Sequence, residues 1–128
     1  MAETANKILV VEDDTVLFNA IKTKLEKNGY VVILARSGEE TYAALRSVGP
    51  VDAVWLDHYL LGKESGIDVM EKLKADQTWK SIPVFVVSNT ASPEKEAVYR
   101  ELGAVAYYVK ADHRLDEVVS EIGRYLKK

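Results

Sequence analysis

Five short apolar runs recur along the 128-residue chain, separated by stretches with helical spacing. The runs are Lys7–Val11, Val31–Ala35, Ala53–Leu56, Val84–Val87 and Ala106–Val109. Each is rich in β-branched or aromatic residues and nearly continuous, which is typical of strands that are buried on both faces. The pattern therefore predicts five strands of one sheet that is covered by helices on both sides.

Each stretch between and after these runs carries a helical signal. Gly29 stands where the glycine after a helix belongs, and Ser37 with Glu40 forms a capping-box pattern at the start of a helix that continues to Val48. Ser92-Pro93 is an N-cap followed by proline, and Asp112 is the expected cap of the last helix. Apolar residues recur at helical spacing in three stretches, namely Phe18, Ile21 and Leu25, then Ile67, Met70 and Leu73, then Leu115, Val118, Val119, Ile122 and Leu126.

The order of these signals is strand then helix, five times over. Right-handed crossovers in such a chain give a doubly wound five-stranded parallel sheet, an α/β fold. The length suits one domain, which we place at residues 7–128 after a flexible segment 1–6. Because such sheets bind ligands at the carboxyl ends of their strands, chemistry is expected just after residues 11, 35, 56, 87 and 109.

Composition excludes several classes of function. The chain has no cysteine, so disulfides, cysteine-ligated zinc, iron–sulfur clusters and cysteine nucleophiles are ruled out. A net charge of −3 does not supply the basic field that a phosphate-binding nucleic-acid domain needs, so no direct nucleic-acid contact is expected. No apolar run is long enough to span a membrane and no signal-peptide core is visible, so the expected location is the cytoplasm.

Polar residues stand at four of the predicted strand ends. Glu12-Asp13-Asp14 follows the first strand, Asp57 the third, Ser88 the fourth and Lys110 the fifth. Each has an ordinary local explanation, such as an acidic first turn of a helix, a loop carboxylate or a lysine that reaches solvent from a strand end. Those explanations do not account for all four features at one edge of one sheet.

The combination has a specific chemistry. Clustered carboxylates repel one another unless a cation neutralises them, and Mg²⁺ prefers such oxygen ligands together with water and phosphate oxygens. A lysine and a hydroxyl can hold the other phosphoryl oxygens. Because a carboxylate can itself accept a phosphoryl group as an acyl phosphate, the residues point to Mg²⁺-dependent phosphoryl transfer.

The segments ILVVEDD, VDAVWLDHYL, VFVVSNTA and GAVAYYVKA resemble the receiver domain of two-component response regulators, over residues 7–126. The resemblance implies the (βα)5 flavodoxin-like receiver fold. It also implies a phosphorylatable switch rather than an enzyme in the usual sense, with phosphoryl supplied by a histidine kinase or a histidine phosphotransfer protein. Carried over residue by residue, Asp57 is the expected phosphoacceptor. The expected Mg²⁺ ligands are Asp13 directly, Glu12 through water, Asp57 and the backbone carbonyl of Tyr59.

The resemblance assigns the switching residues as well. Ser88 matches the hydroxyl position, Lys110 the lysine position and Tyr107 the aromatic switch position. Their rearrangement would reshape the face formed by the fourth helix, fifth strand and fifth helix, which is then the expected docking face for a downstream partner. The protein is expected to be a monomer or a phosphorylation-dependent dimer.

Four positions depart from the family pattern. Ala111 follows Lys110 where the family usually has a cis proline, and since a non-proline cis bond costs about 3 kcal/mol, a trans bond or local strain is expected. Leu61 replaces a common proline, and Gly66 comes one residue late, which predicts a loop one residue longer. Asn89 is bulkier than the usual small residue and is expected to crowd the site.

Two further predictions concern the surroundings of Asp57. Tyr59 and Thr90 are expected to flank the approach of water to the phosphoryl group, and the size of Tyr59 predicts slow hydrolysis. The two histidines, His58 and His113, are not expected to form a site, and His58 is expected at the loop surface.

Three alternative functions make their own demands on the sequence. A flavodoxin-like flavin binder needs a phosphate-cradling loop after the first strand, where this chain has three acids. An aspartyl-nucleophile phosphatase would usually carry its nucleophile motif after the first strand and a cap insertion, and neither is visible. The remaining alternative is a catalytically silent pseudo-receiver that acts as a protein-interaction module, although such a module would lack Asp57 or Lys110.

Overall fold

The computed structural model describes residues 6–89 and 91–127. The strands are β1 Lys7–Val11, β2 Val31–Ala35, β3 Ala53–Leu56, β4 Val84–Ser88 and β5 Ala106–Val109. The helices are α1 Thr15–Lys27, α2 Gly38–Val48, α3 Gly66–Ala75, α4 Pro93–Glu101 and α5 Leu115–Leu126. The strands form one parallel sheet in the order β2-β1-β3-β4-β5, which confirms the predicted fold class.

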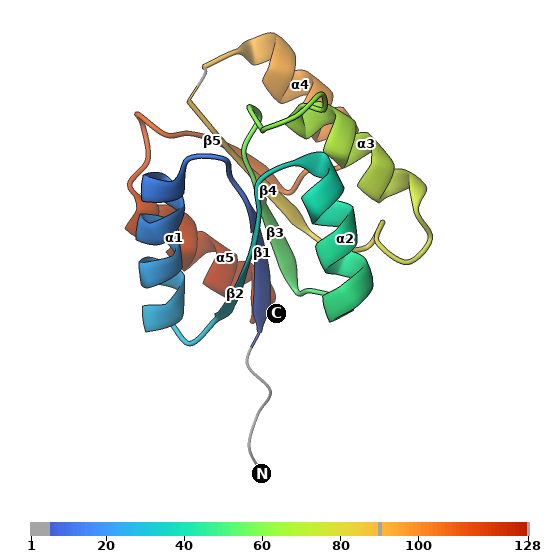
Figure 1. Ribbon diagram of the computed structural model, residues 1–128. Coiled ribbons are helices and arrows are strands. Elements are labelled where there is room, and N and C mark those ends of the chain that lie inside the picture. The colour runs from blue at the N-terminus through green and yellow to red at the C-terminus, as the bar shows by residue number, and fades with distance from the viewer. Residues whose placement is uncertain (1–5, 90, 128) are drawn as a thin grey trace.

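Helices cover both faces of this sheet. Figure 1 shows α1 and α5 side by side on one face and α2, α3 and α4 on the other. Successive strand residues point to opposite faces, so Leu9 and Val11 pack toward α2, α3 and α4 while Ile8 and Val10 pack toward α1 and α5. In β5 the same alternation sends Tyr107 to the first of these cores and Tyr108 to the second.

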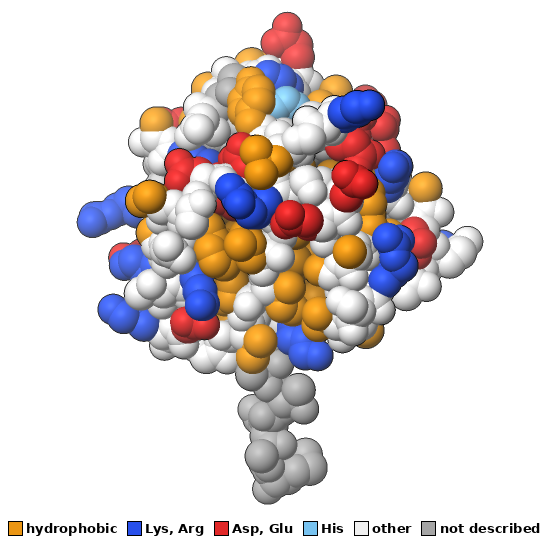
Figure 2. All heavy atoms as spheres, in the orientation of Figure 1, with side chains coloured by type: hydrophobic (Ala, Val, Ile, Leu, Met, Phe, Trp, Pro, Cys, Tyr) orange, Lys and Arg blue, Asp and Glu red, His pale blue; other side chains and the backbone are white. Residues whose placement is uncertain are grey.

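The strand predictions hold closely, with one difference in β4 and one in the degree of burial. β4 extends one residue beyond its predicted end, to Ser88. β2 is an edge strand, and its Val31 and Leu34 are partly exposed, whereas β3 and β4 are buried along their whole length. Figure 2 shows apolar side chains along the middle of this view, where Figure 1 places β2 between α1 and α2, with acidic and basic side chains interspersed around them.

The helix ends follow the local sequence in most cases. Gly29 adopts a φ of 88° after α1, and the Ser37 and Ser92 side chains accept backbone N–H groups at the starts of α2 and α4. The prediction for the last helix was wrong, because Asp112 lies in the turn before α5. Its N–H donates to the carbonyl of Val109, and the helix begins after Arg114.

Among the described residues, no helix is both long and apolar enough to cross a bilayer. Residues 1–5, most of the segment expected to be flexible, lie outside the described residues. The part that follows, from β1 to α5, packs on the single sheet.

Candidate functional site

The acidic residues meet because β1 and β3 are neighbours in the sheet. Parallel pairing aligns Val11 with Leu56, so the residues that follow, Glu12 and Asp57, leave the sheet side by side. The Asp57 N–H donates to the Val11 carbonyl at 3.0 Å, which joins the two strand ends. A carboxylate oxygen from each of Glu12, Asp13 and Asp57 lies within 4.8 Å of the others. The strand order therefore builds the predicted acidic cluster.

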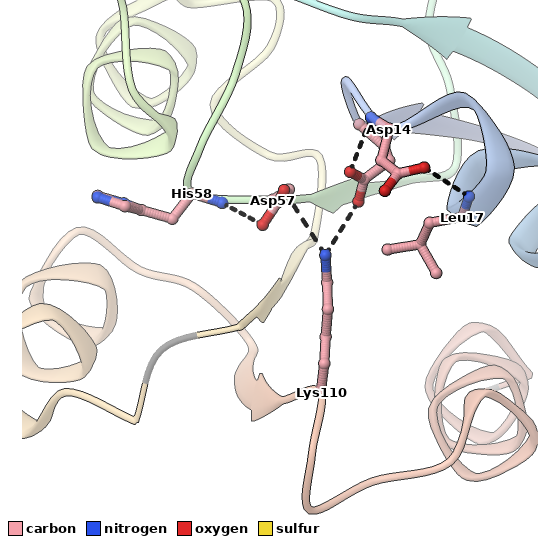
Figure 3. A network of polar contacts seen from close by, with 6 residues as sticks. Asp14, Leu17, Asp57, His58 and Lys110 are labelled. Atoms are coloured by element: carbon pink, nitrogen blue, oxygen red, sulfur yellow. Dashed lines mark hydrogen bonds and ion pairs between the residues drawn. The ribbon is translucent and has the colours of Figure 1, made fainter.

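Lys110 reaches this cluster from the end of β5. Its Nζ lies 3.2 Å from Glu12 Oε1 and 3.6 Å from Asp57 Oδ2. Figure 3 shows the Lys110 side chain pointing toward Asp57. The Lys110 backbone N–H donates to the Ser88 carbonyl at 2.8 Å, so the β4 and β5 ends are joined as well. Both carboxylates are almost fully buried, Glu12 being 1% and Asp57 3% exposed. A cation between two buried acids offsets part of their mutual repulsion.

Backbone donors fix the direction of each carboxylate. The Asp14 N–H donates to Glu12 Oε2 at 3.2 Å, and the His58 N–H donates to Asp57 Oδ1 at 2.8 Å. Asp14 itself turns away and caps α1, its Oδ1 accepting the Leu17 N–H at 3.0 Å. Of the three consecutive acids, two therefore belong to the cluster and the third is a helix cap.

Burial shifts the acidity of the site. Burial, followed by the repulsion of Asp57, raises the pKa of Glu12 from 4.5 to about 7, against the opposing effect of Lys110. Burial also raises the pKa of Asp57, while Lys110 and the His58 N–H act in the opposite direction and the Asp13 charge raises it further. The cluster therefore favours a bound cation, since a cation stabilises the ionised form of each acid.

The other predicted site residues lie around the cluster. Ser88 is buried at the end of β4, and Tyr107 is buried on β5, toward α4. Tyr59 and Asn89 line the same open cleft of about 420 Å³ as Glu12, Asp13, Asp57 and Lys110. Asn89 is exposed at the rim of this cleft. Thr90 lies outside the described residues.

Tyr59 lies at the rim of the cleft. Half of its surface is exposed, and its hydroxyl accepts a hydrogen bond from Lys95 Nζ of α4 at 3.1 Å. The Lys95 ammonium also lies 5.3 Å from the centre of the Tyr59 ring. The ring is thus held toward α4, which limits how far it reaches over Asp57.

The prediction for His58 was wrong. His58 is 7% exposed, and its imidazole points away from Asp57 and Lys110 in Figure 3. Its Nδ1 makes a 2.7 Å hydrogen bond with the hydroxyl of the buried Tyr99 of α4. Burial, with a smaller contribution from Lys95, lowers the pKa of His58. A loop position does not lead to exposure here, because Tyr99 of α4 packs on His58.

The loop after Asp57 is anchored at both ends. The Leu61 N–H donates to the Arg36 carbonyl at 3.0 Å, and the Gly66 N–H donates to the His58 carbonyl at 2.8 Å. Arg36 also donates from Nη2 to the Asp13 carbonyl at 3.4 Å, a contact across the site that no sequence signal indicated. The bond between Lys110 and Ala111 is trans, as are the other peptide bonds of the described residues.

The residues present suit a hard divalent cation. Three carboxylates provide oxygen ligands on one side, and the cleft leaves room for water and a phosphate oxygen. Glu12 and Asp57 are each held by a backbone N–H through one oxygen, and Lys110 lines the same cleft. The acidic cluster could thus bind a metal ion, and an all-oxygen donor set suits hard cations such as Mg²⁺, Ca²⁺ and Mn²⁺.

Two structural features define the class of protein. They are a doubly wound parallel sheet, and an acidic cluster that faces a lysine at the carboxyl edge of that sheet. The family model for the response regulator receiver domain matches residues 8–122. The chain belongs to this family, the receiver domains of two-component systems, and so acts as a phosphoacceptor switch rather than as a classical enzyme. Receiver domains are phosphorylated by histidine kinases.

Three relatives illustrate the likeness. The transcriptional regulatory protein CpxR of Klebsiella pneumoniae is 35% identical over 82% of this chain and 43% of its own length. The phosphorylated cyanobacterial phytochrome response regulator RcpA matches at 26% identity with a TM-score of 0.81, over 95% of this chain and 91% of its own. The Mn²⁺-bound response regulator Rcp1 matches at 24% identity and 0.81, over 94% and 93%. The chain thus spans less than half the length of CpxR.

Proposed function

We propose that Asp57 is the residue that accepts the phosphoryl group. The supporting observation is that Asp57 Oδ2 lies 3.6 Å from Lys110 Nζ at the floor of the open cleft, while its Oδ1 is held by the His58 N–H. Oδ2 is thus the oxygen that faces the lysine, in a residue that lines the open cleft. Attack of this carboxylate on phosphorus would form an acyl phosphate and break the bond to the donor, here the phosphohistidine nitrogen of a kinase or phosphotransfer protein.

The protein's own groups account for the rest of the transfer. Lys110 is positioned to neutralise charge on the phosphoryl oxygens, and Ser88, buried at the end of β4 and joined to Lys110 through the backbone, would supply a hydroxyl. Asp13, Glu12 and the Tyr59 carbonyl would complete a Mg²⁺ site with Asp57. A bound Mg²⁺ would supply charge neutralisation for the transferring group, and the Mn²⁺-bound form of the relative Rcp1 supports a divalent ion here.

The output of this switch would depend on Tyr107 and on the face of the molecule around it. Lys110 follows β5 and Ser88 is the last residue of β4. Tyr107 lies three residues before Lys110, with its ring packed against Tyr99 of α4. A shift of Lys110 or Ser88 toward a phosphoryl group would alter the balance between two arrangements of Tyr107. The partner would then read the face of α4, β5 and α5.

Mass mapping after reaction with acetyl phosphate tests the assignment. The native protein should gain one phosphoryl group at Asp57, and omission of Mg²⁺ should reduce the labelling. Asp57→Asn should not label, whereas Asp112→Asn, a control at an exposed aspartate outside the cleft, should label like the native protein. Equal labelling of Asp57→Asn, or a phosphoryl group at another carboxylate, would contradict the proposal.

A further inference from the structure

His58, the residue after Asp57, is attached to its surroundings at three atoms. Its backbone N–H donates to Asp57 Oδ1 at 2.8 Å, and its carbonyl accepts the N–H of Gly66, the first residue of α3, at 2.8 Å. Its Nδ1 makes the 2.7 Å hydrogen bond to Tyr99 in α4. One residue therefore joins the proposed phosphoacceptor to two helices.

The contact between His58 and Tyr99 is buried and closely packed. Tyr99 is fully buried, and the two rings meet edge to face with their centres 5.9 Å apart. A methyl group at Gly66 would overlap the Tyr99 hydroxyl and lie 2.7 Å from the Asp57 carbonyl, so the hydroxyl packs closely on the turn after Asp57. Breaking this buried hydrogen bond would leave its donor and its acceptor unpaired, which costs free energy, so the folded protein favours the bonded arrangement.

Tyr99 extends this path to the predicted switch residue. Its ring lies against that of Tyr107 with a centre-to-centre distance of 5.8 Å and a tilt of 39°. Both tyrosines belong to the core that packs beneath α2, α3 and α4. An unbroken series of contacts thus runs from Asp57 to Tyr107. It consists of the backbone hydrogen bond to His58, the bond from its imidazole to Tyr99, and the contact of the Tyr99 ring with Tyr107.

We propose, on the basis of the function assigned above, that His58 is a positioning residue that couples Asp57 to α4 through its hydrogen bond with Tyr99. When the Asp57 carboxylate turns to carry a phosphoryl group, the oxygen that accepts the His58 N–H changes its charge and direction. His58 then shifts with the turn, and Tyr99 carries α4 with it. This supplies α4 with a route from Asp57 that is separate from the route through Lys110, β5 and Tyr107, and the two routes meet at the Tyr99–Tyr107 contact.

The physical basis is the directionality of the hydrogen bond, which fixes the position of one ring relative to the other. A hydrogen bond at 2.7 Å between two buried rings transmits a displacement, whereas an apolar contact at the same place would let the rings slip. Loss of one such bond changes an equilibrium constant by about fivefold when the bond is worth about 1 kcal/mol. A change of that size is enough to alter which arrangement of α4 predominates.

Three substitutions separate the hydrogen bond from the packing. Tyr99→Phe removes the hydroxyl and keeps the ring. His58→Leu removes the partner atom and keeps most of the volume, while His58→Asn restores a polar atom at the position of Nδ1, because both atoms are bonded to Cγ. Tyr42→Phe is the matched control, since Tyr42 is a buried tyrosine of the same core whose hydroxyl has no hydrogen-bond partner among the described residues.

The assay is nuclear magnetic resonance of each protein with Mg²⁺ and beryllofluoride, a mimic of the phosphoryl group. Amide signals of Asp57 and Lys110 report occupancy of the site, and amide signals of residues 95–100 report the response of α4. In the native protein and in Tyr42→Phe both sets should shift. In Tyr99→Phe and His58→Leu the site signals should still shift, because every residue at 58 keeps its N–H, while the α4 shifts should fall below half. His58→Asn should recover most of the α4 response.

One further measurement uses the native protein alone. The Nδ1 resonance of His58 should shift on addition of beryllofluoride, with His113, which packs on Tyr108, as an internal reference. A full α4 response in Tyr99→Phe, a response in His58→Asn no greater than in His58→Leu, or an unchanged His58 signal would each overturn the coupling while leaving Asp57 as the phosphoacceptor. Absence of any shift at Asp57 and Lys110 in the native protein would instead overturn the proposed function, and the coupling with it.

Discussion

Replacing Glu12 with glutamine is expected to stabilise the protein, and the gain should grow with pH. Burial raises the pKa of Glu12 from 4.5 to about 7 in the folded protein. The native state therefore holds a proton on Glu12 that the unfolded chain has released, and its stability falls as pH rises through this interval. Glutamine does not titrate, so Glu12→Gln escapes that loss.

The size of the effect follows from the shift itself. Moving a carboxyl pKa from 4.5 to about 7, at about 1.36 kcal/mol for each tenfold change, corresponds to at most about 3 kcal/mol. Relative to the native protein, Glu12→Gln should thus gain up to about 3 kcal/mol between pH 4.5 and pH 8. The loss of the charged contact with Lys110 is already contained in this figure, because Lys110 acts to lower the same pKa.

Urea unfolding of both proteins at several pH values between 4.5 and 8, without divalent ions, measures this difference. Burial lowers the pKa of His58, and a histidine with a lowered pKa makes stability rise with pH below about 6.5. Both proteins contain His58, so its contribution cancels in the comparison. Adding Mg²⁺ should stabilise the native protein more at pH 8 than at pH 5, since the ion binds ionised carboxylates. A difference between the two proteins that stays constant or shrinks toward pH 8 would refute the reasoning.

Three further outcomes are expected from substitutions in the cleft. Asp13→Ala should remain folded and lose the Mg²⁺ dependence of acetyl phosphate labelling, and a destabilised variant with normal labelling would show a structural role for Asp13 instead. Lys110→Ala should label more slowly, and the beryllofluoride-induced change in the Tyr107 ring signals should fall to the part that the His58–Tyr99 route carries; full retention of that change would mean that the lysine does not couple Asp57 to Tyr107. Tyr59→Asn should hydrolyse its acyl phosphate faster than the native protein, as followed by the decay of the phosphorylated mass, because it removes bulk from the cleft rim. An unchanged decay would show that the ring, held by Lys95, does not cover the line of attack.

Much of the fold was predictable because its signals are local and repeated. The five apolar runs coincide with the five strands to within one residue, and Ser37 and Ser92 cap the helices they were expected to cap. The helix before the C-terminus was misjudged at its start, where Asp112 looked like a cap. The turn that precedes α5 is set by the backbone bond between Asp112 and Val109, and a single polar residue does not reveal such a turn.

The acidic cluster was predictable because strand order is a rule of this architecture, and strand order alone brings Glu12 and Asp57 together. Contacts that depend on how helices lie on the sheet were not predictable. The burial of His58 depends on Tyr99, which is 41 residues away in the chain. The contact of Arg36 with the Asp13 carbonyl likewise joins the end of β2 to the loop after β1. Tyr99 lies in a helix with few apolar residues, and nothing in that pattern indicated that it would cover His58.

The close approach at Gly66 constrains how this sequence can vary. Position 66 has no space for a side chain, because an added carbon would overlap the Tyr99 hydroxyl and also lie 2.7 Å from the Asp57 carbonyl and 3.0 Å from His58 Cα. A designer who wishes to introduce alanine there, to strengthen the start of α3, gains too little by shortening residue 99, because the two backbone contacts remain. Shortening residue 99 would in addition remove the hydrogen bond to His58 and leave a buried imidazole without its partner. Glycine at position 66 is therefore required by the turn that carries Asp57, and not by the choice of residue 99 alone.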